Sequence, residues 1–236
     1  MEREPLLPRR LATHTWNISL KRAAALQNRL AAYVRLTPLV GTPNLVAGID
    51  SAYDGDETYV AVLVMDLTAG QVIEIKCAHS GGATLFPYAP GYRAFREGAT
   101  ILKATKRLHH QPELYFVAGH GICHPRLCGN ATHIGLLLNR PTIGCARERL
   151  VGQYEAPGPN KGDYSVIRYS PQAPGVVLRA RPDANPIFIS PGHRIDLTGT
   201  IEQTLRCLTK YRIPEPLRRA HIEAGRFMRL KRDRVI

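Results

Sequence analysis

The order of apolar and polar positions along the chain predicts where its first helices and strands lie. In residues 16–34 apolar side chains recur every three or four positions with Lys and Arg between them, which predicts an amphipathic helix. Residues 45–49 form a short apolar run that ends at Asp50. The two β-rich runs 59–66 and 71–78 are separated by four residues ending in glycine, which predicts a hairpin.

The middle of the chain alternates between helical and strand patterns. A stiff turn at residues 87–91, with two prolines and a glycine, precedes the expected helix. Because strands that alternate with helices usually pair in parallel, this part predicts parallel strands. The expected elements are a helix at 92–108, a strand at 114–117, a helix at 131–138 and a strand at 142–145.

The last third of the chain is less regular. Residues 155–186 are rich in Pro and Gly, so we interpret them as a loop-rich insertion over the sheet. The expected elements of this part are short strands at 164–169 and 176–180, a last strand at 187–190, and helices at 196–209 and 216–230.

Together these elements predict an α/β fold with a mixed sheet flanked by helices. The chain has 236 residues, of which 44% are hydrophobic, and this composition excludes a disordered chain. We expect a single domain over residues 1–236, with residues 1–15 flexible, 155–186 as the insertion and 218–236 as a basic C-terminal helix or tail.

The chain carries a strong positive charge, with 32 Lys and Arg residues against 19 Asp and Glu residues. A formal charge of +13 favours a polyanionic partner, because neutralising phosphates releases condensed counterions. The basic residues concentrate in the last segment, which also fits a solvated helix end or a helix that binds an anionic membrane surface. Nucleic acid is the simpler partner.

The location of the protein is predicted from its apolar runs and cysteines. No apolar run reaches the length of about 18 residues that a membrane-spanning helix needs, and the start of the chain does not resemble a secretory signal. The five cysteines have no CxxC spacing, which favours a reducing compartment over a disulfide framework. We therefore expect a cytoplasmic protein that does not bind membranes.

Two carboxylates and one histidine are the first candidates for chemistry. Asp50 at the end of its strand and Glu97 on the following helix could point into one cleft and hold Mg²⁺, which prefers carboxylate oxygens. They could equally be a turn residue and a surface charge. His124 could stabilise a phosphate or transfer a proton, or be a hydrogen-bonded loop histidine. Zinc is a weaker alternative, because the spacing of its candidate ligands matches no common structural site; these are Cys123, His124, Cys128 and His133.

Several stretches, taken in order, are more specific than any single residue. In their order and approximate spacing the chain resembles the endonuclease V family from about residue 17 to residue 221. The stretches are GID at 48–50, PYAPG at 87–91 with FRE at 95–97, GHGICHPR at 119–126, THIGLL at 132–137, RPTIGCA at 140–146, GHR at 192–194 and YRIPEP at 211–216.

The resemblance implies a ribonuclease H-like fold and a nuclease that uses Mg²⁺, or Mn²⁺ as substitute. Members nick DNA or RNA at the second phosphodiester bond 3′ to inosine, in repair of deaminated adenine. By position, Asp50 and Glu97 match metal ligands, and His124 and His221 match residues of the catalytic site. Tyr88 matches the wedge that fills the space of the extruded base, while Gly91, Gly119 and Leu150 match the pocket for that base.

Three departures from the family pattern bear on activity. Ala118 stands where the family has a metal-binding aspartate, and a methyl group cannot bind a metal. Arg147 replaces a lysine of the catalytic site, and Arg93 replaces an apolar pocket residue. The leading hypothesis is a monomeric, metal-dependent nuclease whose activity is impaired by Ala118. The alternative is a catalytically inactive or divergent nucleic-acid-binding protein on the same fold.

Overall fold

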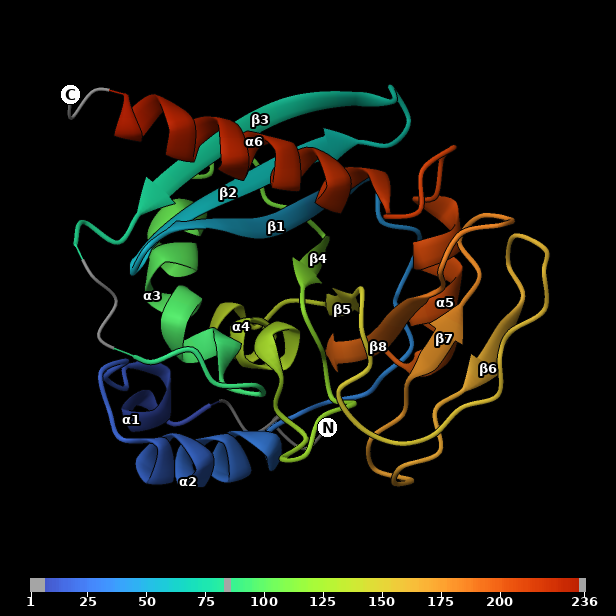
Figure 1. The fold of residues 1–236 in the computed structure, drawn as a ribbon, viewed down its shortest axis with the longest axis horizontal. Helices are drawn as coiled ribbons and strands as arrows, with labels where there is room; N and C mark the ends of the chain where they lie inside the picture. Colours follow the sequence, from blue (N-terminus) through green and yellow to red (C-terminus); the bar gives the residue numbers. More distant parts are fainter. Residues whose placement is uncertain (1–6, 83–85, 234–236) are drawn as a thin grey trace.

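The computed structural model describes residues 7–82 and 86–233, and within them the strands form one eight-stranded sheet (Figure 1). The strand order is β3-β2-β1-β4-β5-β8-β7-β6. The strands are β1 (Leu45–Asp54), β2 (Glu57–Asp66), β3 (Gln71–His79), β4 (Leu114–Ala118), β5 (Thr142–Ala146), β6 (Tyr164–Val166), β7 (Val176–Leu178) and β8 (Ile187–His193). The helices are α1 (Arg9–Ala12), α2 (Leu20–Ala31), α3 (Arg93–Thr105), α4 (Asn130–Leu138), α5 (Leu197–Arg206) and α6 (Glu215–Arg232).

The sheet is mixed, as the sequence predicts. Strands β1, β2 and β3 pair antiparallel, and β4 and β5 continue the sheet parallel to β1. From β5 onward the pairing with β8, β7 and β6 is antiparallel again. The loop-rich segment 155–186 therefore supplies two strands that extend the edge of the sheet. This architecture confirms the predicted α/β class.

Some predicted boundaries are wrong, and tertiary contacts explain why. The helix expected at 16–34 is shorter, because Ser19 caps it by accepting a hydrogen bond from the backbone N–H of Arg22. The first strand does not end at Asp50. Its parallel pairing with β4 ends at Ile49, but its antiparallel pairing with β2 continues to Asp54. Asp50 is therefore a mid-strand residue that lies just beyond the β1–β4 pairing.

Both ends of the chain carry helical structure. Residues 1–6 of the segment expected to be flexible lie outside the described residues, whereas α1 places Leu11 in a buried cluster with α2. The basic C-terminal segment is a helix that crosses β1 and β2 (Figure 1), and residues 234–236 lie outside the described part. No helix within residues 7–82 and 86–233 has the length and apolar character needed to cross a membrane.

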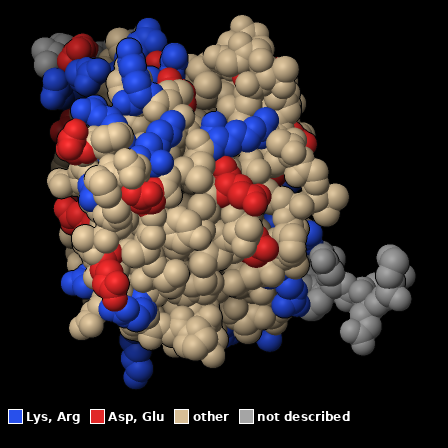
Figure 2. Space-filling view, turned by 90° about the vertical axis from the view of Figure 1, so that its right-hand side faces the viewer, with Lys and Arg blue, Asp and Glu red and all other residues tan. Residues whose placement is uncertain are grey.

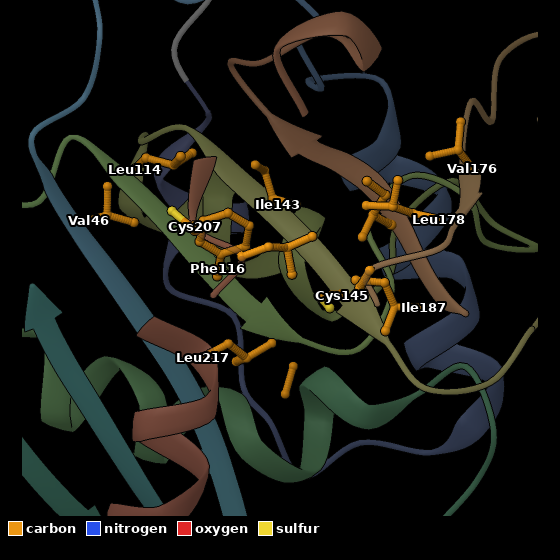
Figure 3. Packing of buried hydrophobic residues seen from close by; sticks show 14 of the residues in the cluster. Val46, Leu114, Phe116, Ile143, Cys145, Val176, Leu178, Ile187, Cys207 and Leu217 are labelled. Carbon is orange, nitrogen blue, oxygen red and sulfur yellow. The ribbon is translucent and has the colours of Figure 1, made fainter. Parts of the chain in front are cut away.

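Two hydrophobic layers hold the helices against the sheet. Alternate side chains of β4 separate into these layers: Leu114 and Phe116 pack with α6, whereas Tyr115 and Val117 pack with α3 and α4. Figure 3 shows Phe116 at the centre of the first layer. Burying each large apolar side chain contributes roughly 1.5–3 kcal/mol, so the two layers supply most of the driving force for this arrangement.

Helix α6 approaches β1 closely at Gly48. A Cβ atom at Gly48 would lie 2.0 Å from the carbonyl oxygen of Pro216 and 2.7 Å from the backbone nitrogen of Leu217. Only a residue without a side chain permits this contact. The contact fixes the start of α6 over the sheet and brings His221 to the carboxyl edge of the parallel strands.

Candidate functional site

A cleft of about 550 Å³ opens at the carboxyl edge of the parallel strands β1, β4 and β5. This is the edge at which ligands bind in many open α/β sheets. The cleft collects nearly all the residues that the sequence singles out, and Glu97 lies directly behind Arg93. Those that line it are Asp50, Tyr88, Gly91, Arg93, Ala118, Gly119, His124, Arg147, Leu150 and His221.

Glu97 is a buried carboxylate that accepts three hydrogen bonds. Only 1% of its surface is exposed. Its Oε1 atom accepts hydrogen bonds from Nε of Arg93 and from the hydroxyl of Tyr53, and its Oε2 atom accepts one from Nδ2 of Asn130 at 3.0 Å. Burial, followed by the neighbouring Glu97 carboxylate, raises the pKa of Tyr53 above its usual range. Tyr53 therefore stays a neutral donor to Glu97.

The carboxylate of Asp50 also accepts three hydrogen bonds. Its Oδ1 atom accepts hydrogen bonds from the backbone N–H of Ser51 at 2.8 Å and from Nη2 of Arg93 at 3.2 Å. Its Oδ2 atom accepts one from Nδ1 of His221 at 2.9 Å. The Arg93 side chain thus spans both carboxylates. Burial opposes its charge, but the carboxylate of Glu97 outweighs this and raises the pKa of Arg93.

These contacts do not fit a divalent metal ion. All four carboxylate oxygens of Asp50 and Glu97 already accept protein hydrogen bonds. Ala118 offers no side-chain ligand, and its carbonyl oxygen accepts a hydrogen bond from Asn130 at 2.9 Å. Nowhere in residues 7–82 and 86–233 do three or more His, Cys, Asp or Glu side chains group as metal ligands. The predicted carboxylates meet, but the guanidinium of Arg93 bridges them.

The zinc alternative has no support in this geometry. Cys123 packs against Ile167 and Val177, whereas Cys128 packs in a separate cluster with Leu26 and Leu30. The thiols of both residues have pKa values raised by burial, to about 11 for Cys123. A neutral, apolar thiol behaves as a small core residue rather than a metal ligand.

His124 holds the turn that leads into α3. Its Nε2–H donates to the carbonyl oxygen of Gly91 at 2.8 Å, and its Nδ1 accepts from the backbone N–H of Arg126 at 3.1 Å. Gly91 has a φ of 81°, and its carbonyl also accepts a hydrogen bond from Gln27 at 2.9 Å. Because both ring nitrogens are used and His124 is buried, its observed role is to position this turn.

Burial of histidines makes the stability of the fold sensitive to acid. Desolvation lowers the pKa of His124 to about 4, and it also lowers the pKa of the fully buried His133 well below the usual 6.5. The unfolded chain, with an ordinary pKa of 6.5, binds more protons between these values. Stability is therefore fully present above pH 6.5 and falls as the pH drops towards 4. His124 alone accounts for roughly 3 kcal/mol of this loss.

Urea unfolding at several pH values tests this expectation. His124→Gln should make the free energy of unfolding less dependent on pH between 6.5 and 4. His109→Gln, at an exposed position, is the matched control and should leave the dependence unchanged. Equal slopes for the wild type and His124→Gln would show that His124 does not cause the loss.

The positive charge is not spread evenly over the surface. On the face that lies to the right in Figure 1, Lys and Arg side chains lie among acidic ones and the middle is uncharged (Figure 2). At the start of α6, Glu215 pairs with Arg218 at 2.7 Å and with Arg219 at 2.7 Å, which neutralises part of the basic helix. The cleft is lined by three arginines and two acidic residues, which are Arg93, Arg147, Arg149, Asp50 and Glu148.

Three residues of the site carry no signal in the sequence. Tyr53, Asn130 and Gln27 hold Glu97 and the Gly91 turn, but a tyrosine in a strand, an asparagine at a helix start and a glutamine in a helix are common structural residues. Only their tertiary contacts show that they support the cleft.

The fold and the edge of the sheet define the class of protein. Three antiparallel strands, parallel strands beyond them, helices on both faces and acidic side chains beside the parallel strands are the features of a ribonuclease H-like protein.

Comparison with known proteins gives the family. The Endonuclease V family profile matches residues 28–222. Endonuclease V of Thermosipho melanesiensis is 41% identical over 208 residues, which cover 88% of this chain and 91% of that protein. The crystal structure of Endonuclease V from Streptomyces avermitilis has a TM-score of 0.85 and 36% identity, over 92% of this chain and 96% of that one. The chain therefore belongs to the Endonuclease V family, whose members are metal-dependent nucleases.

A more distant structure shows the same fold with nucleic acid bound. Endonuclease V of Ciona intestinalis, solved in complex with a 23mer DNA containing an inosine followed by a ribo-adenosine, has a TM-score of 0.75 and 21% identity. The alignment covers 90% of this chain and 99% of that one.

Proposed function

We propose that this chain recognises nucleic acid at a deaminated adenine, with DNA containing deoxyinosine as the first ligand and RNA as the second. The observation that carries the proposal is the single cleft in which Tyr88, Gly91, Gly119 and Leu150 lie together with the cationic Arg147. A base extruded from the stack needs a pocket of this kind, and the neighbouring phosphates need cations.

The parts of the cleft suit the separate tasks of base extrusion. Tyr88 is 81% exposed at the rim, where its ring can fill the space that the base leaves. Gly91 and Gly119 have φ values of 81° and 113°, and their lack of a side chain lets the backbone approach the base edge. His124 and Gln27 fix the carbonyl of Gly91, so that this edge of the pocket is formed in advance.

A nuclease that acts on nucleic acid with a deaminated base is the function that family membership supports. In its finer form, this function is nicking at the second phosphodiester bond 3′ to inosine, with Mg²⁺ or Mn²⁺ held by Asp50 and Glu97. It is favoured by membership in a family of nucleases and by the meeting of both carboxylates at the cleft. Recognition with impaired cleavage is the second candidate, and it is favoured by Arg93, whose guanidinium already pairs with both carboxylates.

We also infer that one cytoplasmic, monomeric domain performs this function. In support, α6 near the end of the chain packs on β1 near its start, and the cysteines of the described chain are free thiols, as expected in a reducing compartment. Both parts of the chain contribute to the cleft through His221 and Asp50.

Fluorescence anisotropy tests the recognition directly. An oligonucleotide with one deoxyinosine is expected to bind more tightly than the same oligonucleotide with deoxyadenosine, in the presence of a chelator. Equal affinity for the two would contradict the proposal. An inosine-containing RNA of the same sequence decides between the two kinds of nucleic acid.

Tyr88→Ala is expected to weaken binding of the deoxyinosine oligonucleotide by about 1–3 kcal/mol, because stacking of a base on an aromatic ring contributes this amount. Tyr164→Ala removes another exposed tyrosine that does not line the cleft and is the matched control. If both variants lose affinity equally, Tyr88 is not the wedge.

A further inference from the structure

The contacts of Arg93 place a cation between two acidic side chains. Arg93 is four residues before Glu97 on α3, so the two side chains meet on one face of the helix. The same guanidinium reaches across to Asp50 on β1, with Nη2 at 3.2 Å from Oδ1. Gly119 lies beside this side chain, since a Cβ atom there would be in ordinary contact with Cδ of Arg93 at 3.6 Å.

A divalent ion and this guanidinium compete for the same partners. An ion held by Asp50 and Glu97 would have to displace Nη2 and Nε of Arg93 from the carboxylate oxygens. It would then lie within a few ångströms of a positive charge, in a partly desolvated place where repulsion is strong. Arginine cannot lose its proton to relieve that repulsion.

We propose that the guanidinium of Arg93 has replaced the divalent metal ion as the cation of this cleft, so that the protein binds damaged nucleic acid without metal. Ala118 and Asn130 complete the replacement. The methyl of Ala118 leaves no third carboxylate to attract an ion, and Asn130 supplies Oε2 of Glu97 with a donor that remains neutral.

Arg93 also faces the ligand. Its side chain is 36% exposed towards the cleft, and its Nη1 atom has no hydrogen-bond partner among the described residues. A guanidinium donates to phosphate oxygens in fixed, planar geometry. Arg93 therefore has a second role, which is to contact the phosphate beside the extruded base.

The test measures Mn²⁺ binding by thermal unfolding in four proteins: wild type, Ala118→Asp, Arg93→Leu and Arg93→Leu/Ala118→Asp. We expect no change of Tm with Mn²⁺ for the wild type or for Ala118→Asp, because Arg93 still occupies both carboxylates. The double variant should gain roughly 5–10 °C at saturating Mn²⁺, because an ion that binds only the folded state stabilises it.

Three results would overturn the inference: a rise of Tm with Mn²⁺ in the wild type, the same rise in Ala118→Asp, or a folded double variant that does not respond to Mn²⁺. If Arg93→Leu does not fold, Arg93→Lys, which keeps the charge, takes its place in both proteins. Paired with Ala118→Asp, Arg93→Lys should then give a larger rise of Tm with Mn²⁺ than Ala118→Asp alone, and an equal response of the two proteins would overturn the inference.

Binding of the deoxyinosine oligonucleotide provides the second measurement, and only this part rests on the proposed function. Wild-type affinity should be equal with chelator and with Mn²⁺, and affinity that requires Mn²⁺ would overturn the inference. If the wild type binds no nucleic acid in either condition, the proposed function fails, while the Mn²⁺ response of the four proteins still decides the role of Arg93.

Discussion

Gly48→Ala is expected to lower the free energy of unfolding by roughly 4 kcal/mol or more, because the added methyl overlaps rigid backbone rather than a movable side chain. The methyl would lie 2.0 Å from the carbonyl oxygen of Pro216, so α6 must shift away from β1. The shift also separates His221 from Asp50, which are 2.9 Å apart between Nδ1 and Oδ2. Urea unfolding gives the first effect, and affinity for the deoxyinosine oligonucleotide gives the second.

The matched control for this experiment is Gly225→Ala on the same helix. There the nearest atom to an added Cβ is Nη1 of Arg229 at 3.5 Å, an ordinary contact with a flexible side chain. Since alanine favours a helix over glycine by about 1 kcal/mol, this variant should be as stable as the wild type or more so. If Gly48→Ala were as stable as the wild type, α6 would not pack on β1 as described.

Arg93→Leu is expected to lower the free energy of unfolding by about 3–5 kcal/mol at neutral pH, because it leaves a buried carboxylate without its cation. Glu97 is 1% exposed and would keep only Tyr53 and Asn130 as donors. The second variant, Arg93→Leu/Glu97→Gln, removes the unpaired charge and should recover most of the loss. Both values come from urea unfolding.

Arg168→Leu serves as the control for the loss of an arginine. Arg168 pairs with Glu155 at 2.8 Å, but their side chains are 65% and 76% exposed. Exposed pairs contribute about 0–1 kcal/mol, so this variant should change stability little. If Arg93→Leu were as mild as Arg168→Leu, the contact between Arg93 and Glu97 would not be a buried ion pair.

Local patterns predict the elements of the fold better than their ends. The repeats of apolar positions predict the helices after α1 and the first five strands, since a helix or strand must bury one face whatever its neighbours are. The end of β1 depends on its pairing with β2, which no local pattern reveals, and so the sequence predicts Asp50 at the strand end rather than within it. The pairing of β6 and β7 with the sheet edge is likewise a tertiary contact.

The contacts within the candidate site also cannot be predicted from local sequence patterns. The resemblance to a family collects the residues of the cleft, because their order along the chain is distinctive. It does not show that Arg93 contacts Asp50, from which it is separated by 43 residues, or that His124 uses both ring nitrogens to hold a turn. These facts depend on distances between elements. The roles assigned to single residues by position therefore remain predictions.

The docking of α6 also sets an order of events during synthesis of the chain. Strands β1 and β2 leave the ribosome before α6. The side chains of β2 that face α6, such as Leu63 and Met65, therefore remain exposed to solvent until that helix has been synthesised. A nascent chain that stops at α5 has Asp50 without His221, and it lacks the helix that covers β1 and β2. The cleft is therefore complete only after α6 has been translated, because His221 comes from that helix.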